Sequence, residues 1–499
     1  MTAKLWLCAS MFIVIGCTKD EEKKQVDKPA PRPAAVVDRT ATESAAPAAV
    51  DMAVTTSSYE ARKEFALGRD RVDNLRTGES IAHFKKAIEL DPEFALAHAY
   101  LAQVVPGAES DRHLAQALAL ASKASEGERQ FIVSQDAFRA GDRPKAEAAL
   151  RKVLEVAPGA WRVELLLAAA DGGRGDDAGQ IKRAERVLQV KPDSSVAYNM
   201  IAYANAARAS WDVAIAAAQK QVELLPGEPN PSDTLGEMYL GAGRFEDAEK
   251  HFIAAQAINP KFTISWQGVG IARAHRGDYK GAYDALDKQR ESDVPTERLD
   301  RYSDAAWIKF AEDKLPEALA KLDAIEKSPG VKALELHAFT ALDRAHMLNY
   351  AGKYADAAKW YAIAVARAES KDGATKRNVL QGQRFGLLRL AAYKGKPDAR
   401  SDKLVTEIEE QAQKNRGAQT EMAIAYARGL AAWAKKDLKG ATAEMSKCEP
   451  RMLACRFDLT KVQRLAKDTV GADATASQIA NLPRRDAISV YWRTHADKK

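Results

Sequence analysis

Residue types that could carry out chemistry are scattered along this sequence rather than grouped. Its four cysteines and eight histidines do not cluster, and His337 and His346 lie nine residues apart without an acidic partner at metal-ligand spacing. The catalytic patterns His-Glu-x-x-His, Ser-x-x-Lys and Gly-x-Ser-x-Gly are absent, as is a Walker phosphate loop. We therefore predict no catalytic residue, no metal site and no bound cofactor. An enzyme with an unrecognised site is the alternative.

The glycine-rich segment Gly173–Ala178 has the spacing of a dinucleotide-binding loop. Such a loop follows a β-strand and opens a helix, so that backbone amides face a pyrophosphate. Here the segment falls between two expected helices, and Asp176 and Asp177 stand where the phosphate would lie. The sequence therefore favours a flexible turn between helices.

The first seventeen residues have the pattern of an export signal. Lys4 precedes an apolar run, Leu5–Ile15, which ends at Gly16 and Cys17. A positive start, a short apolar stretch and a small residue before the cleavage point predict a signal peptide over 1–16. The run is too short for a spanning helix, which needs about 20 apolar residues.

The end of that run, Val14–Cys17, resembles the lipobox of bacterial lipoproteins. The resemblance implies that the Cys17 thiol receives diacylglycerol and that Cys17 becomes the first mature residue, anchored to a membrane by lipid. Thr18, rather than Asp, follows it, which by the same resemblance favours the outer membrane facing the periplasm. The inner membrane and the cell surface are the alternatives.

Residues 17–57 are expected to form a disordered linker. They contain Pro29, Pro31, Pro33 and Pro47, many Ala and Thr, and no aromatic residue. Such a stretch cannot bury enough apolar surface to offset its chain entropy.

Cys448 and Cys455 are the remaining thiols once Cys8 is removed with the signal peptide and Cys17 is modified. An even pair of thiols in an oxidising compartment favours a disulfide. Two separate buried thiols are the alternative.

Prolines repeat at a fixed interval through the middle of the chain. Pro158, Pro192, Pro226 and Pro260 follow one another at 34 residues, and Pro295 follows 35 residues later. The clearest unit, residues 229–262, contains small residues where two helices would cross, an apolar stripe and a turn glycine. Its characteristic residues are Leu235, Gly236, Tyr239, Gly243, Ala248, Phe252, Ala255 and Pro260.

This pattern resembles the tetratricopeptide repeat, a pair of antiparallel helices closed by a proline. The resemblance implies an all-α fold, a right-handed superhelical solenoid. We expect clear repeats over 58–295, degenerate repeats over 296–450 and C-terminal capping helices over 451–499. Residues 105–126 break the phase and are expected to hold one helix, His113–Lys123, without a full repeat. The patterns Ser57-x-x-Glu60 and Ser125-x-x-Glu128 predict capping boxes.

The resemblance also implies a concave groove lined by positions 2, 5, 9 and 12 of each unit. In the best units the polar or aromatic residues at these positions are Asn199, Tyr203, Asn230, Asp233, Glu237 and Gln267. Related domains that bind a C-terminal carboxylate use Lys and Arg there, and these are missing, so a basic or polar peptide is the expected ligand. Solvated residues without a ligand are the alternative. Asp233→Lys with Glu237→Lys is expected to abolish partner binding without unfolding the solenoid.

Composition agrees with an interaction protein. The 499 residues are 46% hydrophobic and 29% charged, and 75 Lys and Arg oppose 69 Asp and Glu. A net charge of +6 is small for this length and argues against a dedicated nucleic-acid binder. We predict a lipid-anchored, non-catalytic scaffold that binds proteins or peptides at the bacterial cell envelope. An accessory subunit of an envelope, cell-wall or secretion machine is the alternative.

Overall fold

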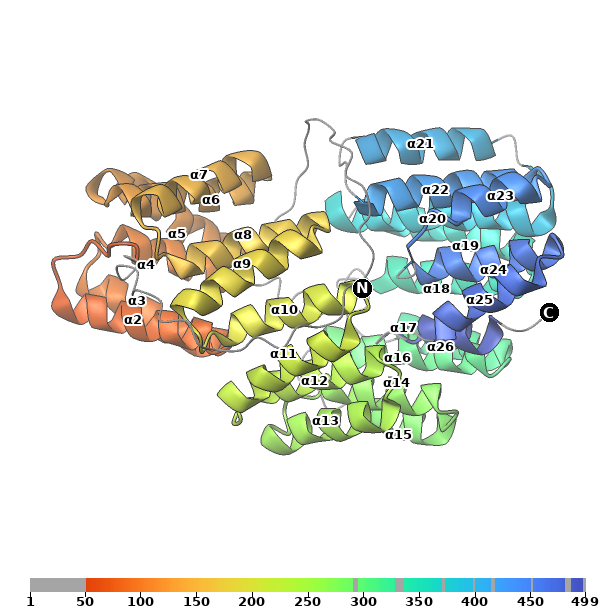
Figure 1. The fold of residues 1–499 in the computed structure, drawn as a ribbon, viewed down its shortest axis with the longest axis horizontal. Coiled ribbons are helices and arrows are strands. Elements are labelled where there is room, and N and C mark those ends of the chain that lie inside the picture. The colour runs from red at the N-terminus through yellow and green to blue at the C-terminus, as the bar shows by residue number, and fades with distance from the viewer. Residues whose placement is uncertain are drawn as a thin grey trace, which may run out of the picture.

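The computed structural model describes residues 51–289, 295–327, 336–369, 373–397, 400–413, 418–449, 452–480 and 486–496. Within these ranges the chain forms helices joined by short turns, and no β-strand occurs there. Successive helices pair as antiparallel hairpins, and each hairpin stacks on the next (Figure 1). The predicted all-α tetratricopeptide solenoid is confirmed in this part of the chain.

The first half of the array runs from α2 to α13. Its helices are α2 (Tyr59–Asp73), α3 (Thr77–Leu90), α4 (Ala95–Val104), α5 (Gly107–Leu120), the short 3-10 helix η1 (Ala121–Lys123), α6 (Glu126–Ala140), α7 (Arg143–Val156), α8 (Trp161–Arg174), α9 (Asp177–Val190), α10 (Ser195–Ala207), α11 (Trp211–Leu224), α12 (Pro229–Gly241) and α13 (Phe245–Ile258).

The second half runs from α14 to α26. Its helices are α14 (Ser265–His275), α15 (Tyr279–Lys288), α16 (Pro295–Ala311), α17 (Leu315–Lys327), α18 (Leu336–Tyr350), α19 (Tyr354–Ala368), α20 (Gly373–Lys394), α21 (Ser401–Gln413), α22 (Ala418–Ala434), α23 (Leu438–Met445), α24 (Leu453–Leu465), α25 (Thr469–Ala480) and α26 (Ile488–His495).

The turn inside a hairpin is built from two residues with distinct roles. Gly141, Gly175 and Gly277 adopt left-handed backbone conformations, with φ of 78°, 80° and 82°, which glycine tolerates without steric cost. An aspartate follows each of them, as Asp142 follows Gly141, and its side chain accepts a hydrogen bond from the first turn of the next helix. The chain thereby ends one helix and starts its partner within two or three residues.

Two local predictions near the N-terminus need correction. Residues 107–120 form α5, which pairs with α4, so the stretch 105–126 contains a full second helix rather than a lone helix at 113–123. The first hairpin is capped by Ser58, whose side chain accepts from the Ala61 amide, and not by Ser57. The capping box of Ser125 and Glu128 is confirmed.

The predicted linker is also too long at its C-terminal end. Met52 is buried and lies against the position of Gly127. The amide and hydroxyl of Thr55 both donate to the carboxylate of Glu128, at 2.8 and 2.5 Å. These contacts fix residues 51–57 against α6, because one apolar side chain and a charge-assisted pair of hydrogen bonds offset the entropy of ordering a short segment.

Hairpins pack through a small residue on one helix and an aromatic ring on another. Phe252 of α13 is fully buried between Gly236 of α12 and Gly268 of α14. A methyl group added to either glycine would lie within 3 Å of the ring, so glycine is needed for this close approach. Gly386 faces the Tyr361 ring in the same way.

The last three helices turn back across the second half of the array (Figure 1). Asp458 of α24 pairs with Arg389 of α20, and Phe457 lies edge-on to Tyr350 of α18. Helix α26 packs against α16 and also touches α14 and α24. The C-terminal segment therefore covers the inner face of the preceding hairpins instead of extending the stack.

Candidate functional site

A row of hydrogen bonds links the first helices of neighbouring hairpins. The side chain of Asn199 on α10 donates to Thr234 on α12 at 3.5 Å, and Gln267 on α14 donates to Asp304 on α16 at 2.5 Å. Each donor stands at position 5 of its unit and each acceptor at position 6 of the next unit. Ser303 donates to Asp343 in the same way, at 2.6 Å. Position 5 therefore connects repeats in this chain.

Asp233 occupies the same position, but position 6 of the next unit is Gly268, which has no side chain to form a hydrogen bond. It instead accepts a hydrogen bond from the Ser265 hydroxyl at 2.5 Å, and only 1% of its surface is exposed. The structure therefore changes the expected result of Asp233→Lys: it should destabilise the solenoid, because it would bury a lysine charge among first helices.

The predicted groove residues therefore fall into two groups. Asn199, Asp233 and Gln267 are buried and bonded to neighbouring helices. Tyr203, Asn230 and Glu237 are half-buried on α10 and α12.

Tyr203 and Glu237 occupy position 9 of consecutive units and lie together. The Tyr203 hydroxyl donates to Glu237 Oε2 at 2.5 Å, which holds the carboxylate at a fixed place on the face. A phenol that retains solvent-facing ring surface beside a positioned carboxylate suits a ligand with an apolar part and a positive charge. This pair is the candidate functional site.

Sequence reasoning missed the acceptors Thr234, Asp304 and Asp343. They share a spacing from which they could have been predicted, since each follows a polar residue at position 5 by 35 to 40 residues.

Burial raises the pKa of Asp343, and hydrogen bonds from Ser303 and Trp307 act in the opposite direction. Asp343 is thus an interior acceptor and not a solvent-facing carboxylate.

Burial also lowers the pKa of His346 to about 3, and the charge of Arg389 acts in the same direction. His346 Nδ1 lies 2.9 Å from the Tyr361 hydroxyl inside the second half of the array. The neutral ring therefore serves as a core residue, and His346 is not available as an acid or base at neutral pH.

His346→Gln should flatten the pH dependence of stability. Between about pH 3 and pH 6.5 the unfolded chain binds a proton at His346 that the folded chain does not, so His346 makes the free energy of unfolding fall as pH falls, by up to about 1.4 kcal/mol per unit. Urea unfolding at pH 7, 6, 5 and 4.5 measures both slopes. Equal slopes in the two proteins would contradict the buried neutral histidine.

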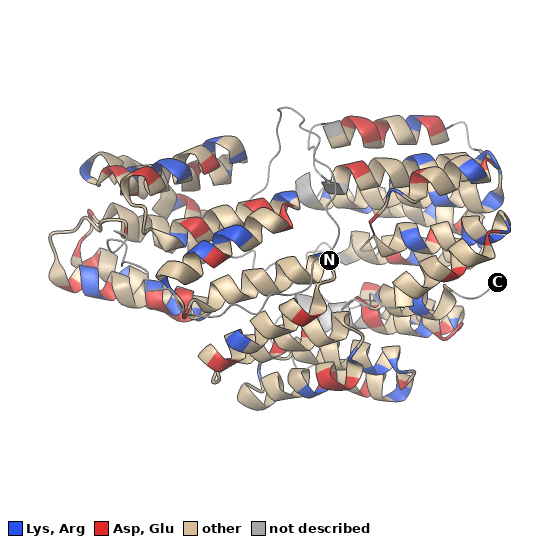
Figure 2. Cartoon of the chain, viewed as in Figure 1, with Lys and Arg blue, Asp and Glu red and all other residues tan. Residues whose placement is uncertain are grey.

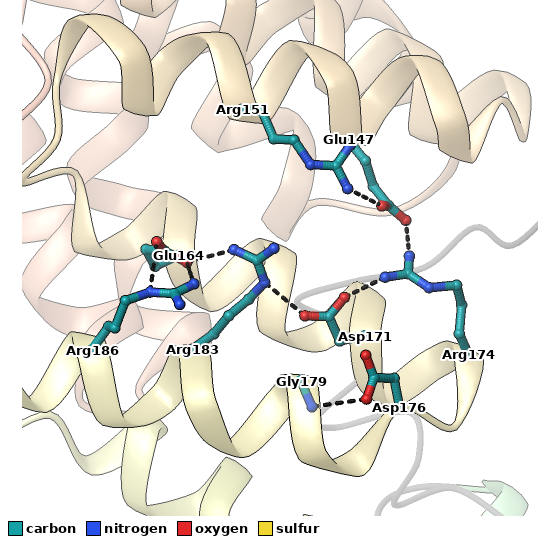
Figure 3. Close-up of polar contacts among 9 residues, drawn as sticks. All are labelled: Glu147, Arg151, Glu164, Asp171, Arg174, Asp176, Gly179, Arg183 and Arg186. Carbon is teal, nitrogen blue, oxygen red and sulfur yellow. Dashed lines mark hydrogen bonds and ion pairs between the residues drawn. The ribbon is translucent and has the colours of Figure 1, made fainter. Parts of the chain in front are cut away.

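Four arginines and three acidic residues form a continuous chain of ion pairs at α7, α8 and α9 (Figure 3). Arg174 contacts Glu147 and Asp171, and Arg183 donates to Asp171 at 2.6 Å and to Glu164 at 2.8 Å. Arg151 and Arg186 extend the chain at its two ends. Because Glu147 lies on α7 and its partner Arg174 on α8, the network joins adjacent repeats.

The glycine-rich segment lies beside this network as the turn between α8 and α9. Asp176 accepts from the Gly179 amide at 2.8 Å and so caps α9 itself (Figure 3). The amide that a phosphate would need is thereby bonded within the chain. The predicted turn between helices describes this segment correctly.

Cys448 and Cys455 form a disulfide, with their Cα atoms 6.6 Å apart, at the start of the segment that turns back. Cys17, the predicted signal peptide and linker residues 17–50 lie outside the described residues.

A family model supplies independent evidence on the repeats. The model described as tetratricopeptide repeat matches residues 234–293, which include most of α12 and all of α13, α14 and α15. The chain therefore contains tetratricopeptide repeats. Tetratricopeptide arrays form protein–protein interaction scaffolds, and this tetratricopeptide-repeat protein has that architecture.

Two curated relatives each match part of the chain. The heat-shock cognate co-chaperone sgt12 of Aspergillus fumigatus is 29% identical over 87 residues, 17% of this chain and 26% of its own. Anaphase-promoting complex subunit 3 of Schizosaccharomyces pombe is 25% identical over 146 residues, 29% of this chain and 22% of its own. The tetratricopeptide-repeat protein thus matches about a quarter of the length of these relatives.

Among solved structures, a tetratricopeptide repeat protein from Parabacteroides merdae is 16% identical. The match covers 52% of this chain and 98% of the other, with a TM-score of 0.40.

The described part of this tetratricopeptide-repeat protein has no three His, Cys, Asp or Glu side chains grouped so that they could hold a metal ion. No helix in that part is both long and apolar enough to span a bilayer. Basic and acidic residues are interspersed along the described helices (Figure 2).

Proposed function

We propose that this protein is a non-catalytic scaffold that binds a protein or peptide at the first helices α10 and α12. The observation that carries the proposal is the half-buried pair of Tyr203 and Glu237, joined at 2.5 Å on the face that the repeats present inward. Extended faces of this kind bind extended ligands through many small contacts.

The proposed ligand is a basic or polar peptide segment. Glu237 offers a half-buried carboxylate that the Tyr203 hydroxyl holds in place on α12. A Lys or Arg of the ligand would form a charge-assisted hydrogen bond with Glu237. The Tyr203 ring would pack against the aliphatic part of that side chain.

Glu237→Lys should reduce recovery of partner proteins at least 5-fold, because it places a positive charge where the ligand's positive group binds. The measurement is affinity capture of the full chain from crosslinked native membranes, with quantitative mass spectrometry. Glu246→Lys is the matched control, since it makes the same charge change on α13 of the same hairpin, where the Glu246 side chain is 74% exposed.

The Glu246→Lys variant should recover partners as the wild type does. Equal recovery by the wild type and Glu237→Lys would place the binding surface elsewhere, and loss with both variants would indicate a general charge effect.

We further propose that the protein is a bacterial lipoprotein, held at the outer membrane on its periplasmic side. The apolar run that ends at Gly16 and Cys17 supports this proposal, as does the Pro-rich stretch that follows. Two acyl chains on one cysteine are sufficient for stable membrane attachment, whereas a single chain gives marginal binding.

Cys17→Ser should abolish lipid attachment, because a hydroxyl is too weak a nucleophile to be alkylated there. Cells grown with a clickable palmitate analogue should label the wild-type protein and leave the variant unlabelled. The variant should also move from the membrane fraction to the soluble or unprocessed fraction. A labelled Cys17→Ser protein would overturn the proposed lipid anchor.

A further inference from the structure

The C-terminal helix α26 occupies the inner face of the second half of the array. It packs on α14 and α16, and its aromatic residues reach Tyr350 at the end of α18. These three helices are the first helices of consecutive hairpins. The chain therefore places one of its own helices across the face that other hairpins present to a ligand.

The repeat register shows that this is the same face as the candidate site. Ala318 stands 70 residues after Ala248, the small second-helix residue of the clearest unit. With the same offset, Trp307 stands at position 9, the position of Glu237, and Phe310 stands at position 12. Position 9 is thus polar on α12 and aromatic on α16, position 12 is Leu240 on α12 and aromatic on α16, and α26 contacts both residues of α16.

Aromatic contacts hold the middle of α26. The Tyr491 ring stacks on Phe310 with centroids 4.6 Å apart, and lies 5.1 Å from Tyr350 and 6.4 Å from Trp307. Trp492 Nε1 donates to the Tyr350 hydroxyl at 3.1 Å. The face of α16 and α18 is therefore built to receive adjacent aromatic side chains from a helix.

Polar contacts hold the C-terminal end of α26 at the ends of the first helices. Arg493 donates to the main-chain oxygen of His275 at 2.6 Å, and its guanidinium lies over the Phe245 ring at 4.9 Å. This oxygen belongs to the last residue of α14, where the helix dipole favours a cation. His495 Nε2 lies 2.9 Å from Asp313 Oδ1, in the turn after α16.

We infer that α26 is an intramolecular ligand of a peptide-binding face formed by α14, α16 and α18. The partner that fits this face is a helical segment that presents two adjacent aromatic residues followed by an arginine. This inference deepens the proposed scaffold function and rests on it. Binding of such a partner requires α26 to leave.

Two features make α26 replaceable. It is a helix of eight residues, too short to be stable by itself in water. Arg493 Nε is buried without an acceptor among the described residues, so the bound helix leaves one donor unsatisfied. A partner whose arginine Nε finds an acceptor would gain the hydrogen bond that α26 lacks. In competition with it, α26 has a high effective concentration because it belongs to the same chain.

The test uses the full chain and a fluorescein-labelled peptide with the sequence of residues 486–496. Tyr491→Ala with Arg493→Ala should free the face, so that fluorescence anisotropy shows at least 10-fold tighter peptide binding than the wild type. Tyr59→Ala with Arg62→Ala is the matched control, because it removes the same residue types from an exposed part of α2. The control should bind the peptide as the wild type does.

Equal binding by all three proteins, or no binding by a folded double variant, would overturn the inference. If the double variant does not fold, hydrogen exchange of the wild type decides. Amides of α26 that exchange at least 10-fold faster than those of α24 support a replaceable helix, and a common exchange rate overturns it. Because neither readout involves Glu237, these results are distinguishable from those of the membrane capture experiment.

Discussion

Asp458→Ala should lower the free energy of unfolding by about 3–5 kcal/mol, because it leaves the Arg389 guanidinium buried without its counter-charge. The two side chains are 5% and 0% exposed, and Arg389 Nε donates to Asp458 Oδ2 at 2.8 Å. Tyr393 and Tyr426 also donate to the Asp458 carboxylate, at 2.6 and 2.5 Å. The substitution therefore removes one charge and the acceptor of three donors.

Urea unfolding followed by circular dichroism measures the loss. Asp473→Ala is the matched control, since Asp473 is exposed on the neighbouring helix α25 and its removal should cost less than about 0.5 kcal/mol. Arg389→Met with Asp458→Leu should recover part of the loss, because no charge is left buried, although the Tyr393 and Tyr426 hydroxyls still lose the Asp458 acceptor. A loss below about 1 kcal/mol for Asp458→Ala would mean that water reaches the pair.

The position of this ion pair changes how the solenoid behaves. In a simple repeat array each unit contacts only its neighbours, and stability is a sum of local terms. Arg389 and Asp458 lie 69 residues apart in the chain, and Tyr491 reaches Phe310 over a longer separation. The turned-back C-terminal segment thus joins hairpins that an open array would leave independent.

Repeat period and packing residues could be predicted from the sequence because they depend on local geometry. Pro226 and Pro260 mark the ends of two hairpins, and Gly236 lies where its helix approaches Phe252. These proline and small-residue positions recur in each clear repeat, so a single sequence shows the pattern several times. The hairpins from α6 to α15 follow from this pattern.

The roles of the groove residues could not be predicted in the same way. The register places Asp233 on the inner face, but burial depends on what the next repeat offers, and Ser265 supplies a hydroxyl there. Likewise, the repeat period does not predict that α26 covers Trp307, because α26 lies outside the periodic part of the sequence. Met52 and Thr55 order the end of the linker through burial and through hydrogen bonds to Glu128, which composition does not reveal.

Phe252→Ala should cost about 3–5 kcal/mol, and the loss should stay local. The ring is fully buried, and positions for added methyl groups on Gly236 and Gly268 lie 2.8 and 2.6 Å from its atoms. Because Gly236 and Gly268 carry no side chains, neither of them can fill the cavity. Ile253→Ala is the matched control, since Ile253 is 40% exposed and its truncation should cost less than about 1 kcal/mol.

Hydrogen exchange separates this local effect from that of Asp458→Ala. Phe252→Ala should speed amide exchange in α12 to α15, where the cavity weakens two neighbouring hairpins, and leave α2 to α7 unchanged. Asp458→Ala should instead speed exchange in α18 to α26, which the buried ion pair holds together. Uniform acceleration along the whole chain in both variants would mean that the array unfolds as one cooperative unit, and would contradict the nearest-neighbour description of its N-terminal half.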